Sequence, residues 1–146
     1  MYSKILLASD GSETALRAAA TAAELARRFD ASLTVLHVFA IPLTPVSLAA
    51  TPGAEVDPLL LERMAGEVQD AVARRTGRVL EEAGVPYATR QEIGHPAETI
   101  VRVAQQEGFD LVVLGSRGLS EIRSFLLGSV SDKVSHHAPC PVLIVK

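Results

Sequence analysis

Several residue types are scarce in this chain of 146 residues, and each scarcity excludes a class of protein. The single cysteine, Cys140, cannot form a disulfide within the chain, which excludes a secreted scaffold held by disulfides. No apolar run approaches the roughly 18 residues of a transmembrane helix, and residues 5–9 form too short an apolar stretch for a signal peptide. We therefore expect a cytoplasmic protein that does not enter a membrane.

An excess of positive charge is also missing. The 14 basic and 17 acidic residues give a net charge of −3, so the chain carries no electrostatic footprint for nucleic acid or an anionic membrane. The chain has no tryptophan, so any flat ring that it binds would be held by aliphatic walls rather than stacked on indole. Hydrophobic residues make up 48% of the chain, which is enough for the core of one domain over residues 1–146.

The apolar residues indicate a regular alternation of strands and helices. Apolar runs predict strands at 5–8, 33–39, 87–93, 111–114 and 141–146, and helical spacing predicts helices at 15–29, 57–83, 95–108 and 129–137. This pattern predicts an α/β fold with a single doubly wound, five-stranded parallel sheet in the order 3-2-1-4-5 and helices on both faces. Ligands bind such sheets where the winding reverses, at the carboxyl ends of strands one and four. We therefore expect the loops after Ser9 and Leu114 to carry the function.

One segment interrupts the alternation. Residues 40–57 contain three prolines among small residues and show no periodicity. They are too long for an ordinary strand-to-helix turn, and both a mobile lid and an insertion without function fit them.

A glycine pattern follows the fourth predicted strand. Gly115-Ser116-Arg117-Gly118 is followed by nine residues and then by Gly128-Ser129-Val130-Ser131. Gly115 would let the backbone approach a ligand, and Gly118 would permit a turn that exposes amides. Gly128 and Ser129 would begin the last helix, with Asp132 completing a capping box. The free amides there and the hydroxyls of Ser129 and Ser131 predict a phosphate cradle.

At these residues the sequence resembles the universal stress proteins, in their ATP-binding branch. That branch carries the motif G-x2-G-x9-G-(S/T), which Gly115, Gly118, Gly128 and Ser129 match without a gap. Residues 4–12, 36–38 and 139–145 extend the resemblance over the whole chain. The resemblance implies a regulatory ATP, with or without Mg²⁺, in a stress response. It places Asp10, with Ala8 and Ser9 beside it, at adenosine and the backbone of Val38 at adenine. It also implies that ribose and phosphates are held by Gly115, Ser116, Arg117, Gly118, Gly128, Ser129, Val130 and Ser131.

Other interpretations of single residues stay open. Asp10 could simply cap the first helix, and Arg117 could be a solvated cation rather than a counter-charge for phosphates. Arg123 is a weaker candidate for that counter-charge. The adjacent His136 and His137 suit the negative end of a helix better than a metal site, because neighbours on a helix point apart. We therefore predict no metal site in the protein itself.

The same residues also bear on activity and assembly. No lysine, histidine or carboxylate lies within the two short stretches 115–118 and 128–131, and Glu121 in the spacer has no identifiable partner. We therefore expect ATP binding with at most slow hydrolysis and no catalytic residue. The apolar strand Val142–Val145 would lie bare at the sheet edge, which predicts a homodimer formed through it. A rival hypothesis is a dimeric, stress-linked interaction module whose nucleotide pocket is vestigial or takes an AMP-type ligand.

Overall fold

The computed structural model describes residues 1–40, 57–118 and 127–146, and its strands form one parallel sheet. The sheet order is β3-β2-β1-β4-β5, as the sequence predicts. The strands are β1 (Lys4–Ala8), β2 (Ser32–Phe39), β3 (Tyr87–Ile93), β4 (Leu111–Gly115) and β5 (Val142–Val145). The winding therefore reverses between β1 and β4, and β3 and β5 form the two edges.

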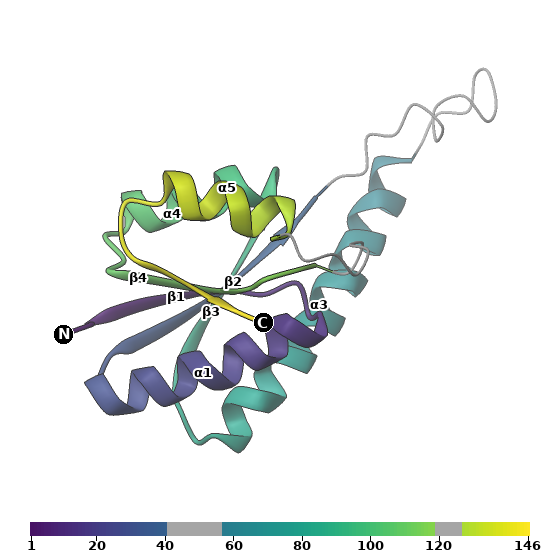
Figure 1. Ribbon diagram of the computed structural model, residues 1–146. Coiled ribbons are helices and arrows are strands. Elements are labelled where there is room, and N and C mark those ends of the chain that lie inside the picture. Colours follow the sequence, from purple (N-terminus) through teal and green to yellow (C-terminus); the bar gives the residue numbers. More distant parts are fainter. Residues whose placement is uncertain (41–56, 119–126) are drawn as a thin grey trace.

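Helices cover both faces of the sheet (Figure 1). The helices are α1 (Glu13–Phe29), α3 (Pro58–Glu82), α4 (Pro96–Gln106) and α5 (Ser129–His137). Helices α1 and α3 lie on one face, and α4 and α5 lie on the other. Within the described residues, no helix is long and apolar enough to cross a membrane.

The alternation of side chains along β1 produces two separate cores. Ile5 and Leu7 pack with the alanines of α1, whereas Leu6 and Ala8 pack with residues of α4 and α5. All four of these side chains are buried, as expected for a central parallel strand covered on both faces. The buried face of α1 consists of alanines, which lets the helix approach the sheet closely. This close approach matters at the functional site, where α1 touches the end of β4.

The structure rules out the open alternative that Asp10 caps the first helix, and it corrects the expected capping box at the last helix. Ser12, and not Asp10, is the N-cap of α1: its hydroxyl accepts the N–H of Ala15, while Asp10 Oδ1 accepts the N–H of Ser12. Helix α5 begins with Gly128 as its N-cap, so Ser129 is already helical and the capping box with Asp132 does not form. Both differences arise because helix caps depend on backbone angles that sequence spacing does not fix. The 40–57 segment and the 119–127 spacer fall almost wholly outside the described residues.

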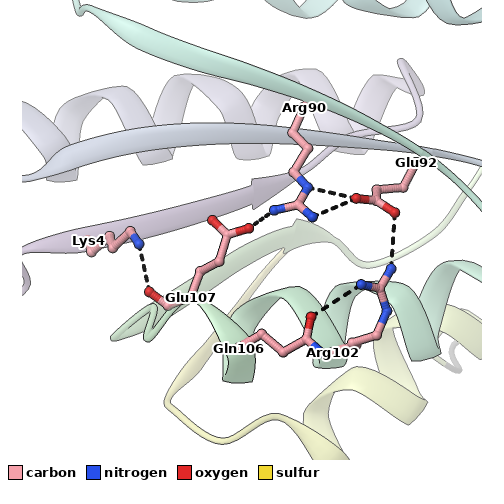
Figure 2. Close-up of polar contacts among 6 residues, drawn as sticks. All are labelled: Lys4, Arg90, Glu92, Arg102, Gln106 and Glu107. Carbon is pink, nitrogen blue, oxygen red and sulfur yellow. Dashed lines mark hydrogen bonds and ion pairs between the residues drawn. The ribbon is translucent and has the colours of Figure 1, made fainter.

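A network of charged side chains joins the edge strand β3 to α4 (Figure 2). Arg90 pairs with Glu92 at 2.7 Å and also with Glu107, and Arg102 pairs with Glu92 at 3.0 Å. Hydrogen bonds from Arg90, then from Arg102, hold the pKa of Glu92 below its usual value. Charged side chains on an edge strand discourage pairing with another chain. The other edge, β5, reads Val-Leu-Ile-Val and has no such protection.

Candidate functional site

A cavity of about 280 Å³ lies at the carboxyl ends of β1, β2 and β4, on the side where the winding reverses. Its volume is close to the lower end of the roughly 300–1,000 Å³ typical of small-molecule sites. All but one of the site residues expected from the sequence line it: Ala8, Ser9, Asp10, Val38, Gly115, Arg117, Gly118, Gly128, Ser129, Val130 and Ser131. The exception is Ser116, which is buried and does not line the cavity.

The loop after β1 is fixed by buried hydrogen bonds around Ser9. The Ser9 hydroxyl lies 2.8 Å from the hydroxyl of Thr76 on α3 and accepts the N–H of Gly11. The Ser9 carbonyl oxygen lies 2.9 Å from Nδ1 of His37 on β2. Because a carbonyl can only accept, His37 carries a proton on Nδ1. Burial lowers the pKa of His37 and outweighs this hydrogen bond, which favours the neutral form of the ring.

The two halves of the glycine motif are joined through Ser116. Its carbonyl oxygen accepts the N–H of Gly128 at 2.7 Å and the hydroxyl of Ser131 at 2.9 Å. Its own N–H donates to the carbonyl of Val145 on β5. Ser116 therefore acts as a backbone junction between β4, α5 and β5. The hydroxyl of Ser131 is likewise occupied by carbonyl oxygens, so a contact from it to a phosphate stays a prediction.

The Arg117 peptide is oriented by the start of α1. Its carbonyl oxygen accepts a hydrogen bond from the Thr14 hydroxyl at 2.7 Å and a longer one from the Ser12 hydroxyl at 3.4 Å. The described residues contain no cis peptide bond. In a trans peptide the carbonyl and the following N–H point in opposite directions. The N–H of Gly118 therefore points away from Thr14 and α1.

Gly115 and Gly118 of the motif lack a side chain for different structural reasons. A Cβ on Gly115 would lie 2.5 Å from Thr14 Oγ1 and 2.8 Å from the backbone nitrogen of Ala15. Gly115 thus allows α1 to pack against the end of β4. It also lines the cavity, so a close approach of its backbone to a ligand stays a prediction. A Cβ on Gly118 would lie 2.8 Å from Asp10 Oδ2. Gly118 therefore leaves space for the Asp10 carboxylate, which lies beside it.

An aliphatic wall completes the cavity, and part of it was missed by the sequence analysis. The additional lining residues are Ala15, Ala40, Pro96, Ile100 and Leu114. Pro96 is the first residue of α4, which follows β3 at the same edge of the sheet, and Ile100 lies one turn later. The helix start at His95-Pro96 was a signal that could have placed both residues at the site.

Among the described lining residues, Asp10 and Arg117 carry charge. The described residues contain no group of three or more His, Cys, Asp and Glu side chains that could hold a metal ion. The arrangement combines an aliphatic wall, two backbone loops, a helix N-terminus, one carboxylate and one guanidinium. Helix N-termini and guanidinium groups bind anions, and an aliphatic wall accepts a flat apolar ring.

Comparisons with known proteins agree with this architecture. The profile of the universal stress protein family matches residues 1–146. A universal stress protein of Thermus aquaticus is 39% identical over 147 residues, with 100% of both chains covered. One of Methanocaldococcus jannaschii is 37% identical and covers 100% of this chain and 83% of the relative. A solved universal stress protein in complex with cAMP is 29% identical, with a TM-score of 0.72 over 99% of this chain and 97% of that one.

Proposed function

The chain belongs to the universal stress protein family, and from this premise we propose that it binds ATP in the cavity as a regulatory ligand. The observation that carries the proposal is the junction at Ser116. It holds the Gly115–Gly118 loop against the first turn of α5, at the point where the sheet reverses its winding. The amides of both segments and the Arg117 guanidinium suit a phosphate chain.

The aliphatic wall is the proposed adenine site. Val38, Pro96, Ile100 and Val130 line the cavity from β2, α4 and α5. The backbone of Val38 would contact the ring, and Asp10 would accept hydrogen bonds from ribose hydroxyls. Any Mg²⁺ would be held chiefly by phosphate oxygens, with Asp10 the one carboxylate among the described lining residues.

The charge of the site favours a second candidate ligand as well. One carboxylate and one guanidinium nearly balance among the described lining residues. That balance suits a ligand of low charge, such as cAMP, and a structurally similar family member was solved with cAMP. Direct competition between ATP, AMP and cAMP decides between a triphosphate and a monophosphate ligand.

The proposed role is regulation in the cytoplasm rather than catalysis. Asp10, the one carboxylate among the described lining residues, accepts the N–H of Ser12 at 3.0 Å and is assigned to ribose in this proposal. Phosphoryl transfer needs a positioned base or acceptor in addition to a phosphate cradle. We expect hydrolysis to be slow at most, with nucleotide occupancy acting on a partner or on assembly.

We also propose a homodimer formed through β5. This strand is an edge of the sheet, and Leu143 exposes its side chain while Val142 and Ile144 pack toward the core. Pairing with β5 of a second copy about a twofold axis would cover the exposed backbone and Leu143 together.

The test of nucleotide binding is a calorimetric titration of the wild-type protein and a Gly128→Val variant. Gly128 has φ −62° and ψ 154°, a conformation open to every residue, so the change adds bulk without backbone strain. We expect ATP affinity to fall at least about tenfold while the circular dichroism spectrum is unchanged. Gly66→Ala, in the middle of α3, is the control and should bind like the wild type. A wild type that binds none of the three nucleotides would contradict the proposal.

A further inference from the structure

Two threonine hydroxyls outside the cavity lining are each bonded to one of the cavity's loops. Thr76 of α3 is bonded to Ser9, and Thr14 of α1 is bonded to the carbonyl of Arg117. Neither threonine lines the cavity. We propose that Thr76 and Thr14 are positioning residues, each of which holds one half of the nucleotide site in its binding geometry. This inference rests on the proposed nucleotide binding.

Thr76 holds the loop after β1. Its side chain is fully buried, and its Oγ1 lies 2.8 Å from the buried Ser9 hydroxyl. The same Ser9 hydroxyl accepts the N–H of Gly11 at 3.3 Å. Gly11 has a positive φ of 75°, which makes this turn depend on its local contacts. Without the Thr76 hydroxyl, the buried Ser9 hydroxyl would lose a partner and the turn carrying Asp10 would lose an anchor.

Thr14 holds the glycine loop. Its hydroxyl donates to the Arg117 carbonyl at 2.7 Å, a short hydrogen bond between residues 103 positions apart in the chain. This bond fixes the plane of the peptide that joins Arg117 to Gly118. The direction of the Gly118 N–H and the starting point of the Arg117 side chain both depend on that plane. Ser12 donates to the same carbonyl at 3.4 Å and is the weaker support.

The two supports act on different parts of the ligand, which makes the inference testable. The Ser9–Ser12 turn carries Asp10, the residue assigned to adenosine, so Thr76 should affect adenosine and ATP by the same factor. The Arg117 peptide belongs to the loop assigned to phosphates, so Thr14 should affect ATP more than adenosine. A merely structural role would lower the stability of either variant and leave the affinity of the folded protein for both ligands unchanged.

The experiment measures adenosine and ATP affinity by calorimetry for Thr76→Val and Thr14→Val, two changes that keep side-chain shape and remove the hydroxyl. We expect Thr76→Val to weaken both ligands by roughly three- to tenfold, and Thr14→Val to weaken ATP by that factor with adenosine affected less. Thr76→Ser and Thr14→Ser keep the hydroxyl and should recover most of the lost affinity. Thr21→Val is the matched control, because the Thr21 hydroxyl donates to Arg17 within α1, away from the cavity.

Amide exchange measured by NMR in the absence of ligand gives an independent readout. Thr76→Val should speed exchange at the Gly11 amide, and Thr14→Val should change the Gly118 amide signal. If the wild type binds no nucleotide, the proposed function fails, and unchanged amides would then overturn the positioning role as well. If the wild type binds and both valine variants match Thr21→Val in affinity, the positioning role alone is overturned. Urea unfolding of each variant ensures that affinities are compared for folded protein.

Discussion

Replacing Gly115 by alanine tests why the motif begins with glycine. The added Cβ would lie 2.8 Å from two backbone atoms at the start of α1, the Ala15 nitrogen and the Thr14 carbonyl carbon. The backbone of Gly115 is not in the left-handed region, so alanine would not be strained there by its own conformation. The predicted cost therefore comes entirely from crowding between β4 and α1.

The size of the effect follows from the kind of atom that must move. A side chain could rotate away, but two backbone atoms of a capped helix can move only together with the helix. Overpacking of this kind costs about 1–3 kcal/mol of unfolding free energy. With a urea dependence of about 2 kcal/mol per molar for a protein of this size, the unfolding midpoint should fall by roughly 0.5–1.5 M.

The matched comparison is Gly66→Ala on α3. A Cβ on Gly66 meets no atom within 4 Å, and alanine favours a helix interior over glycine. This variant should therefore gain about 0.5–1 kcal/mol in unfolding free energy. Urea denaturation followed by circular dichroism measures both changes. If Gly115→Ala unfolds at the wild-type midpoint, α1 does not require the absence of a side chain there, and Gly115 would have to be explained by the ligand after all.

Three further predictions concern charge, pH and assembly. Arg117→Ala should weaken ATP by roughly tenfold or more and adenosine little, since a hydrogen bond to a charged group contributes about 1.5–3 kcal/mol; equal losses in calorimetry would show that Arg117 is only solvated or structural. Burial lowers the pKa of His37 below its usual value near 6.5. Below about pH 6.5 the unfolded chain therefore takes up a proton that the folded chain does not, and the free energy of unfolding should fall as the pH drops. Urea midpoints at successive pH values test this, and His37→Asn, which can still donate to the Ser9 carbonyl, should lack that part of the pH dependence. Leu143→Lys should shift the species seen by light scattering from dimer to monomer. A wild type that is monomeric at micromolar concentration would refute the β5 dimer. Ile144→Lys is the poorer test because Ile144 packs against the core.

The sheet order was predictable because the burial of each central strand shows in the sequence as a continuous run of apolar residues. Residues 5–8 and 111–114 are continuous apolar runs, and only strands covered on both faces use such runs. With helices between all strands and right-handed crossovers, few orders of strands remain. The place of the cavity followed from that order. Pro96 and Ile100 were not predicted as site residues because the switch point between β1 and β4 indicates the loops after those two strands, whereas both residues lie on the helix that follows β3.

The roles of individual polar groups were harder to predict, because hydrogen-bond partners depend on loop geometry. Asp10 was one candidate for the N-cap of α1. Ser12 is the N-cap, and the Asp10 carboxylate accepts the backbone N–H of Ser12. The bond from the Ser131 hydroxyl to the Ser116 carbonyl was not predicted, and the expected contact of Ser131 with a phosphate stays a prediction. No role was predicted for Thr14 or Thr76, since their hydrogen-bond partners lie far away in the chain. Spacing along a sequence shows which loops meet, but not which oxygen each hydroxyl reaches.

The chemistry of the proposed site consequently rests more on the backbone than on side chains. The hydroxyls of Thr14, Thr76 and Ser131 are all bonded within the protein, where they hold the loops. The groups that we propose to bind a phosphate chain are then the loop amides, the first turn of α5 and the Arg117 guanidinium. Backbone amides recognise the shape and charge of a phosphate group but do not by themselves distinguish a triphosphate from a monophosphate. Discrimination between ATP and a monophosphate should therefore depend on how far the Arg117 guanidinium reaches along the phosphates of the ligand. The ratio of ATP affinity to cAMP affinity in Arg117→Ala is then the measurement that identifies the ligand class.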